Sequence, residues 1–383
     1  MKTPVLLVST TTRWFGTARI PGALAKAGFD VSLLTPRNSL AEKSRFVARV
    51  GYLPDDATPM QWVFAFATMV KAIAPRLVLP CDDMAFRLLQ MLVLSPPRDL
   101  QPTLQLQLGA LIRESLGESA HYRSSVDKTV LPQAAEALGV RVPPWAIVTT
   151  PEEAEAMTST LGFPLVLKRG YGFAGEGVAI CSERAELHRA FSVLSNEDTL
   201  NLEGATGTRL LAQAHVPGGI SYYGVAAWKG ALLAGYATDK VVANPEPKGP
   251  ATVLRYHRAP EIRGFAEKLA RGFGMSGLFS LECIVHERTG ESYLLEINRR
   301  IAPGTFRGGL LNVDMCAALR AALDGLPSPS RSDLDEGECG IRANFPQEWL
   351  RDPGSRYLRD YPVDVPWDDP ELIEAMLALR HEA

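Results

Sequence analysis

The N-terminal part of the chain alternates short apolar runs with stretches in which apolar residues recur at helical spacing. Val5–Ser9, Val31–Thr35 and Leu77–Pro80 are apolar runs typical of buried strands. A helix is expected near Arg19–Ala27, and another starts at Thr58-Pro59, where threonine is a favoured N-cap and proline a favoured first helical residue. Strands that alternate with helices predict a doubly wound α/β domain over roughly residues 1–110.

This first domain lacks the glycine fingerprint of a dinucleotide site after its first strand, so we do not interpret it as the nucleotide-binding domain. Four residues follow its predicted strands at the positions where α/β sheets usually bind ligands: Arg13, Trp14, Asp82 and Asp83. Loop residues without a functional role are an equally good interpretation of these four.

The middle of the chain holds two lysines in patterned surroundings. Ser124–Asp127 resembles a capping box that opens a helix ending at Gly139, which places Lys128 in the first turn. A buried strand then ends at Lys168, and residues 170–177 hold four glycines before the next strand. Glycines let a backbone approach a ligand closely, so the hairpin could cover phosphates. A solvated lysine and an ordinary flexible hairpin are the alternatives.

The segment Leu210–Gly218 reads as a strand that runs into a turn, and further strands are expected at Tyr222–Trp228 and Leu232–Thr238. A helix is expected over Glu261–Phe273. The tail beyond residue 330 is rich in proline and acid, and one short helix is expected near Pro370–Leu379.

Phe279–Val285 and Leu294–Arg300 read as the strands of a hairpin. If the hairpin is symmetric about Thr289, Glu282 lies opposite Glu296, and Asn298 points the same way because side chains two positions apart share a face. Facing carboxylates are unfavourable unless a positive charge lies between them. Oxygen ligands of this kind suit Mg²⁺, which takes its remaining ligands from water and phosphates. An exposed sheet face with solvated acids is the alternative.

Composition narrows the classes of function. At 383 residues the chain is long enough for two or three domains, and 46% hydrophobic with 22% charged residues is typical of soluble globular proteins. The net charge of −3 gives no reason to expect nucleic acid or an anionic membrane surface as a partner. The five cysteines are scattered and form no C-x-x-C pair, which favours a reducing compartment over disulfides or zinc. No run approaches the roughly 20 apolar residues of a membrane span, so we expect a cytoplasmic protein.

These parts occur in a specific order: a lysine on a helix, a strand-borne lysine with a glycine hairpin, a strand ending in Val-Pro-Gly, and a Glu…Glu-x-Asn hairpin. The order resembles the ATP-grasp superfamily, which includes D-alanine–D-alanine ligase, biotin carboxylase and carbamoyl phosphate synthetase. Leu295-Glu296-Ile297-Asn298-Arg299-Arg300 is the strongest single motif. The resemblance implies an N-terminal α/β domain over residues 1–110, an ATP-grasp α+β fold over 111–325 with a lid at about 140–215, and a C-terminal extension over 326–383.

The resemblance also implies an ATP- and Mg²⁺-dependent ligase that activates a carboxylate as an acyl phosphate, joins it to an amine or similar nucleophile, and releases ADP and phosphate. Mn²⁺ could replace Mg²⁺, and a homodimer is one possible assembly. The ATP contacts implied are the phosphate lysines Lys128 and Lys168, the latter also near adenine, the hairpin residues Gly172, Phe173, Ala174 and Gly175, and the adenine segment Gln213, Ala214 and Val216. Glu282, Glu296 and Asn298 match the Mg²⁺ ligands, and Arg300 and Arg255 match arginines near the transferred phosphoryl group.

The chain departs from the family pattern at three places. Ala214 replaces a usual acid, Ile220 and Ser221 stand where a ribose-binding acid is usual, and Arg299 replaces a proline. Other ATP-grasp chemistry (carboxylation or phosphoryl transfer) and a non-catalytic ATP-binding protein therefore remain alternatives. The retained lysine and metal-ligand set argues against the non-catalytic alternative, and the short stretch after residue 330 argues against a biotin carboxylase.

Overall fold

The computed structural model describes residues 2–172, 177–196, 209–246 and 249–379, which form two compact units. Unit 1 consists of Met1–Ser119, Tyr222–Ser280 and Asn298–Ala383, and unit 2 of Ala120–Ser221 and Leu281–Ile297. The units interleave along the sequence, whereas the boundaries predicted at residues 110 and 325 divide the chain into consecutive segments. Those boundaries stay a prediction.

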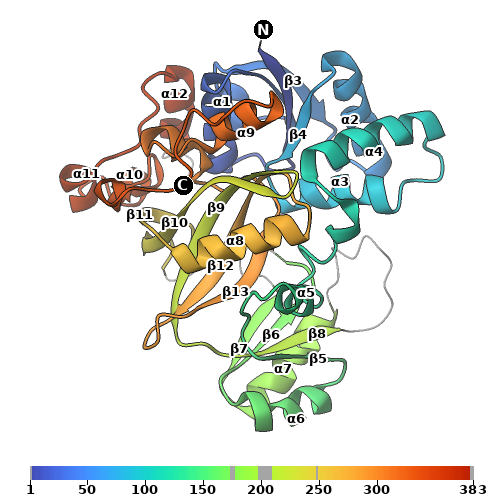
Figure 1. Cartoon of the computed structure of the whole chain (residues 1–383), viewed down its shortest axis with the longest axis vertical. Coiled ribbons are helices and arrows are strands. Elements are labelled where there is room, and N and C mark those ends of the chain that lie inside the picture. Colours follow the sequence, from blue (N-terminus) through green and yellow to red (C-terminus); the bar gives the residue numbers. More distant parts are fainter. Residues whose placement is uncertain (1, 173–176, 197–208, 247–248, 380–383) are drawn as a thin grey trace. The chain divides into compact units, whose positions relative to one another are not determined.

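Unit 1 begins with a four-stranded parallel sheet in the order β3-β2-β1-β4 (Figure 1). Val5 of β1 pairs with Val31 of β2 on one side and with Leu77 of β4 on the other. The alternation of strands and helices confirms the predicted doubly wound α/β class. The elements are β1 (Thr3–Val8), α1 (Phe15–Lys26), β2 (Phe29–Pro36), η1 (Leu40–Lys43), β3 (Val47–Leu53), α2 (Pro59–Ile73), β4 (Leu77–Pro80), α3 (Asp83–Leu94) and α4 (Pro102–Leu116).

The helix starts differ in how well the sequence predicts them. Helix α2 begins as expected: the Thr58 side chain accepts a hydrogen bond from the Gln61 backbone, and the Gln61 side chain accepts one from the Thr58 backbone. Helix α1 begins at Phe15, earlier than the expected Arg19, and Pro21 lies inside it. Its N-cap, Trp14, makes no side-chain capping bond, so the sequence contains no signal at that end.

A second sheet has six strands in the order β13-β12-β9-β10-β11-β14. Helix α8 lies across the sheet and contacts β10 (Figure 1). The elements are β9 (Gly218–Trp228), β10 (Ala231–Ala243), β11 (Ala251–His257), α8 (Pro260–Gly272), β12 (Gly277–His286) and β13 (Ser292–Asn298). The predicted strands and helix of this region are all present, and β9 and β10 extend beyond their predicted ends.

The C-terminal tail is built into unit 1. The predicted helix near Pro370–Leu379 is α12, but the tail also holds β14 and two further helices that the sequence does not reveal, because elements of four or five residues show no periodicity. Strand β14 pairs antiparallel with β11, from Tyr256 opposite Gly340. The elements are η3 (Thr305–Leu310), α9 (Met315–Leu323), η4 (Glu336–Glu338), β14 (Gly340–Ala343), α10 (Gln347–Arg351), α11 (Arg356–Asp360) and α12 (Pro370–Ala378).

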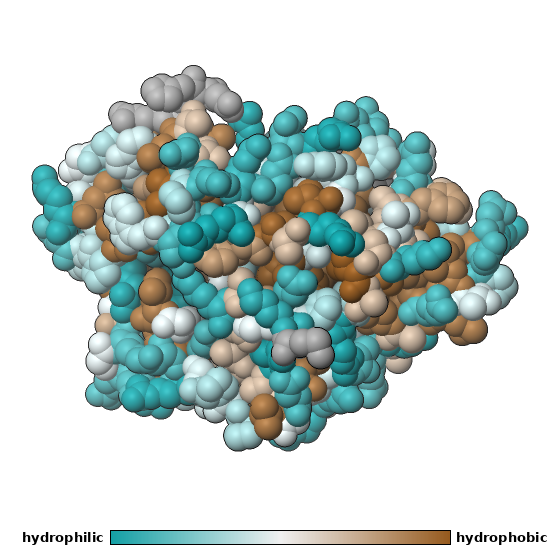
Figure 2. All heavy atoms as spheres, turned by 90° about the horizontal axis from the view of Figure 1, so that it is seen from above, coloured by the Kyte–Doolittle hydropathy of each residue, from teal (hydrophilic) through white to brown (hydrophobic). Residues whose placement is uncertain are grey.

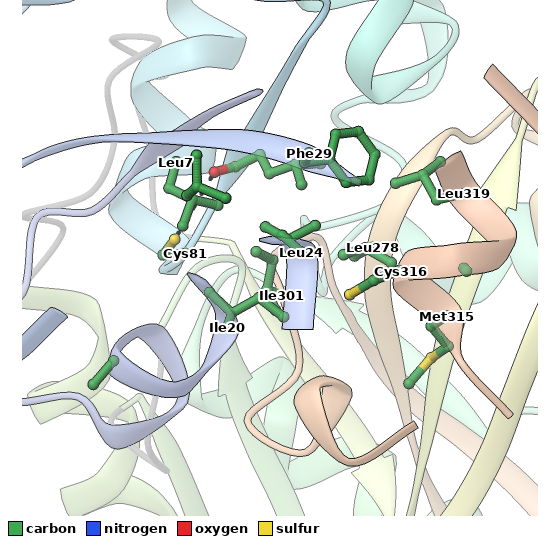
Figure 3. Packing of buried hydrophobic residues seen from close by; sticks show 14 of the residues in the cluster. Leu7, Ile20, Leu24, Phe29, Cys81, Leu278, Ile301, Met315, Cys316 and Leu319 are labelled. Atoms are coloured by element: carbon green, nitrogen blue, oxygen red, sulfur yellow. Dashed lines mark hydrogen bonds between the residues drawn. The ribbon is translucent and has the colours of Figure 1, made fainter. Parts of the chain in front are cut away.

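One apolar core holds the pieces of unit 1 together. Figure 3 shows Leu7 of β1 and Cys81, which directly follows β4, near Ile20 and Leu24 of α1. Residues from distant parts of the sequence complete this core: Leu278 of β12, Ile301, and Met315, Cys316 and Leu319 of α9, with Leu372 and Met376 of α12. The tail therefore stabilises the N-terminal sheet, because removing it would expose core side chains.

Unit 2 contains a four-stranded antiparallel sheet in the order β5-β8-β6-β7. Helices α6 and α7 cover one face, where Leu165, Leu167, Leu210 and Ala212 form an apolar core (Figure 1). The elements are η2 (Ser119–His121), α5 (Leu131–Ala137), β5 (Trp145–Val148), α6 (Pro151–Leu161), β6 (Leu165–Arg169), β7 (Val178–Cys181), α7 (Arg184–Asn196) and β8 (Leu210–Ala214). Side chains on the other face of this sheet are the starting point for the functional site.

Within the described ranges, no helix is long and apolar enough to cross a membrane. The view in Figure 2 shows apolar side chains interspersed among hydrophilic ones. All five cysteines are free thiols, as the sequence predicts.

Candidate functional site

Lys168 and Gln213 lie on the face of the β5-β8-β6-β7 sheet that points away from the apolar core. Side chains alternate along each strand, and Lys168 pairs with Leu211 while Val166 pairs with Gln213. The neighbouring residues Leu167 and Ala212 point into the core. The strand pattern thus places a lysine and an amide on one face.

The ammonium of Lys168 is buried, with the residue 7% exposed. The pKa of Lys168 is lowered from 10.5 to about 8, chiefly by burial; the carboxylates of Glu296 and Glu282 raise it, and the charge of Lys128 lowers it. Both predicted metal-binding carboxylates therefore lie close enough to act on Lys168. The structure brings together the two lysines and two glutamates that the sequence singles out, all within unit 2. The pairing register that the sequence predicts for Glu282 and Glu296 stays a prediction.

Lys128 lies in a turn, and the predicted helix around it is wrong in its start. Helix α5 begins only at Leu131, with Pro132 in its first turn. Asp127 holds the preceding turn, because its Oδ1 accepts hydrogen bonds from the Thr129 backbone N–H at 2.9 Å and from the Thr129 hydroxyl at 2.7 Å. Such local bonds of aspartate favour a turn over a helix.

The turn presents Lys128 to the glycine hairpin and to Glu296. Its backbone N–H donates to the carbonyl of Gly170 at 2.8 Å. Its Nζ donates to the carbonyl of Gly172 at 3.0 Å and lies 3.0 Å from Oε2 of Glu296. One lysine therefore links the start of the hairpin to a predicted metal ligand.

Gly170 shows why this segment is rich in glycine. A Cβ at Gly170 would lie 2.7 Å from Oδ1 of Asp127, so a side chain would disrupt the turn that holds Lys128. Gly177 has a φ of +76°, which favours glycine, and its carbonyl accepts a bond from the Arg169 N–H at 2.9 Å. The predicted phosphate contacts Phe173, Ala174 and Gly175 lie outside the described residues.

The segment predicted to lie against adenine contains an unusual amide. Gln213 is 2% exposed, and its Oε1 has no hydrogen-bond partner among the residues that the structure describes. A buried carbonyl oxygen without a donor is costly, and such a group is often completed by a ligand. Val216, three positions after Gln213, is also buried. The Ala214 N–H donates to the carbonyl of Pro144 at 2.9 Å.

The remaining predicted site residues lie in unit 1. Arg300 donates from Nε to Oδ2 of Asp83 at 3.1 Å and from Nη2 to Oδ1 of Asn298 at 3.2 Å. Asp82, by contrast, fixes the loop after β1, accepting bonds from the Thr10 backbone and hydroxyl and capping α3 through the Ala85 N–H. The sequence places both aspartates at a strand end, and the structure gives them different partners.

Two further arginines lie in contrasting surroundings. Arg299, which stands where the family has a proline, is buried between the rings of Phe86 and Phe279. Arg255 is exposed and alternates along β11 with the buried Leu254 and Tyr256, so it points away from the unit 1 core. A role for Arg255 near a transferred phosphoryl group stays a prediction.

The donor set is compatible with a hard divalent cation. Glu282, Glu296 and Asn298 supply only oxygen atoms, which suits Mg²⁺, and the ammonium of Lys128 already lies against one of the carboxylates. No cluster of three or more histidine, cysteine, aspartate or glutamate side chains suited to a metal occurs in the described part of the chain. That these two carboxylates and the amide bind one ion stays a prediction; such a set would leave coordination positions for phosphate and water.

The chain was compared with known proteins. Residues 133–317 match the family model of the ATP-grasp domain. The carbamoyl phosphate synthase large chain of Vibrio cholerae is 29% identical over 189 residues, which cover 46% of this chain and 16% of that protein. The matched segments make up only 7% to 16% of the length of the first three curated relatives.

Solved structures show the same fold at low sequence identity. A biotin carboxylase from Campylobacter jejuni in its β-γ-ATP complex has a TM-score of 0.65 at 12% identity, covering 89% of this chain and 74% of that one. A carboxyaminoimidazole ribonucleotide synthase from Aspergillus clavatus complexed with ATP has a TM-score of 0.62 at 16% identity, covering 90% and 82%. The resemblance drawn from the sequence is confirmed.

Proposed function

Because the chain carries an ATP-grasp domain, we propose that it is an ATP- and Mg²⁺-dependent ligase that joins a carboxylate to an amine or a similar nucleophile. The carboxylate attacks the γ-phosphate of ATP, ADP leaves, and an acyl phosphate forms. The nucleophile then attacks the acyl carbon, and inorganic phosphate leaves as the new carbon–nitrogen bond forms. The observation that carries this proposal is the grouping of Lys128, Lys168, Glu282 and Glu296 within unit 2.

The residues of this group have complementary roles in the proposed reaction. Phosphoryl transfer depends chiefly on positioning and on compensating negative charge. The ammonium groups of Lys128 and Lys168 oppose the charge of the phosphates, and Lys168 does so from a rigid strand. Mg²⁺, held by Glu282, Glu296 and Asn298, would screen the phosphate oxygens when bound. Arg300 supplies a further positive charge, anchored by Asp83.

Gln213 supports the proposal that adenine binds to this face of the sheet. Its Oε1, which has no hydrogen-bond partner within the described ranges, lies on the same sheet face as Lys168, and an exocyclic amino group of a purine is a donor of the kind that this oxygen lacks. Adenine would be recognised by Oε1 of Gln213 and by the backbone of Ala214 and Val216. These contacts would compensate for the acid that the family usually has where this chain has Ala214.

The reaction is tested by ADP release in pools of carboxylic acids and amines. We expect a pool that raises ADP release above the rate with ATP alone, and a further increase when a matching amine is added. Hydroxylamine should trap the acyl phosphate as a hydroxamate, and an ¹⁸O-labelled carboxylate should pass one ¹⁸O to the released phosphate. Release that depends on bicarbonate would indicate carboxylation instead. Tight ATP binding without turnover in any pool would favour the non-catalytic alternative.

A further inference from the structure

Lys128 occupies the position of a counter-ion at one predicted metal ligand. Its Nζ lies 3.0 Å from Oε2 of Glu296, and the two side chains are only 9% and 24% exposed. The second acceptor of the same ammonium is the carbonyl of Gly172, also at 3.0 Å. The ion pair is therefore largely shielded from solvent, and the ammonium of Lys128 contacts both the Glu296 carboxylate and the Gly172 carbonyl.

A divalent cation that binds Glu296 must first displace this ammonium. Displacement without a replacement anion breaks the shielded ion pair of a mostly buried lysine, which is unfavourable. A nucleotide changes this balance, because its phosphates offer the ammonium a new anionic partner. Free metal is thus opposed by Lys128, whereas metal that arrives with phosphates is not.

We propose that Lys128 makes the metal site selective for the metal–nucleotide complex over the free divalent cation. In the nucleotide-free protein it neutralises Glu296 and excludes the free ion. When phosphates bind, the ammonium moves to them and releases the carboxylate to the metal. This inference rests on the proposed function, since it assumes that phosphates enter beside Lys128.

The local structure suits a side chain that changes partner while its backbone stays fixed. Asp127 and the carbonyl of Gly170 hold the turn, so the motion is confined to the flexible lysine stem. Lys168 differs because it is carried on a strand, where burial lowers its pKa and the charges of Glu296, Lys128 and Glu282 also act on it. The exchange of partners also releases the Gly172 carbonyl, which couples the start of the hairpin to nucleotide binding.

The first test measures Mn²⁺ binding to the full-length, nucleotide-free protein by electron paramagnetic resonance. We expect Lys128→Met to bind Mn²⁺ at least tenfold more tightly than the wild type, and Lys128→Arg to resemble the wild type because it keeps the charge. Arg141→Met is the matched control, since it removes a positive charge that pairs with Glu291 on the same hairpin, 3.2 Å away, and leaves Glu296 paired. The double variant Lys128→Met/Glu296→Gln should lose the increase in Mn²⁺ affinity that Lys128→Met shows. An unchanged Mn²⁺ affinity in Lys128→Met would overturn the proposal.

The second test needs only the wild type. Because coupling between two ligands is reciprocal, a non-hydrolysable ATP analogue should raise Mn²⁺ affinity at least tenfold, and Mn²⁺ should raise analogue affinity by the same factor. Equal Mn²⁺ affinity with and without the analogue would overturn the inference even if Lys128→Met failed to fold. A wild type that binds neither the analogue nor ATP in the presence of Mg²⁺ would instead overturn the proposed function, so the two failures are distinguishable.

Discussion

Arg300 donates a hydrogen bond from Nε to Oδ2 of Asp83, 3.1 Å away across 217 positions of sequence. The Nη2 group of the same guanidinium donates to Oδ1 of Asn298 at 3.2 Å. An arginine predicted to oppose the transferred phosphoryl group is therefore oriented by the first residue of α3. The bond to Asp83 restricts the orientation of the guanidinium plane.

Asp83→Asn should lower turnover about tenfold, because a weakened charge-assisted hydrogen bond of roughly 1.5–3 kcal/mol allows Arg300 to leave its orientation. The nucleotide Kd should change little, since the phosphate lysines are untouched. ADP release at saturating ATP and a separate nucleotide titration measure the two effects.

A double-mutant cycle separates positioning from general damage. Arg300→Lys keeps the charge but loses the planar group, and it should lower turnover by itself. Asp83→Asn should then have little additional effect in that background, because the bond is already lost. Fully additive losses would show that Asp83 does not act through Arg300.

Glu296→Gln and Asn298→Ala should each abolish Mg²⁺-dependent turnover, because each removes a metal ligand and lowers affinity for the ion. Thermal unfolding should show that both variants remain folded, since neither residue lies in an apolar core cluster. The measurement is ADP release across a range of Mg²⁺ concentrations. Wild-type activity at low Mg²⁺ in either variant would refute the assignment of that ligand.

Strong local patterns made much of the fold predictable. The Thr58-Pro59 helix start, the strand ending at Lys168 and the hairpin carrying Glu282 and Glu296 all follow from periodicity and capping. The parallel sheet follows from alternating strands and helices. These elements depend on interactions between residues close in sequence, so a single sequence suffices to find them.

Features that depend on long-range contacts could not be predicted. Lys128 was expected on a helix, but its backbone N–H bonds to the carbonyl of Gly170, which is distant in sequence, and helix α5 begins only at Leu131. Asp83 is one of two adjacent acids at a strand end, and only the approach of Arg300 from the distant hairpin distinguishes it from Asp82. The residue pattern around Lys128 and around Asp83 does not indicate which distant residue each will contact.

Nucleotide affinity should fall as the pH rises through about 8. Burial lowers the pKa of Lys168 to about 8 in the nucleotide-free protein, so its ammonium is charged below that pH and neutral above it. Only the charged form opposes the phosphates. Lys168→Arg should remove this decline, because arginine stays protonated over the same range.

The measurement is the Kd of a fluorescent ATP analogue between pH 6.5 and 9.5. A wild-type Kd that does not vary over this range would contradict a role for Lys168 as a phosphate-opposing charge. A decline that persists unchanged in Lys168→Arg would assign the titration to another group.

Asp364 connects the C-terminal tail to helix α1 through the buried Arg19 and to η3 through the buried Arg307. Its carboxylate bonds to Nε of Arg307 and lies 3.7 Å from Nη1 of Arg19, with the side chains between 3% and 6% exposed. It also accepts the backbone N–H of Phe345 at 2.6 Å. Burial lowers the pKa of Arg19 to about 10, and the charge of Asp364 opposes that shift.

Asp364→Asn should lower the free energy of unfolding by about 3–5 kcal/mol, because it leaves two buried guanidinium groups without the carboxylate that they share. Asp368→Asn is the matched control from the same tail. Its carboxylate pairs with Lys26 at 2.7 Å, but the side chains are 41% and 61% exposed, and a surface pair of this kind is worth about 1 kcal/mol or less. Chemical denaturation of both variants measures the difference. If the two variants lost equal stability, the arginines would have to be solvated or paired elsewhere, and the buried network would not be what holds the tail to the parallel sheet.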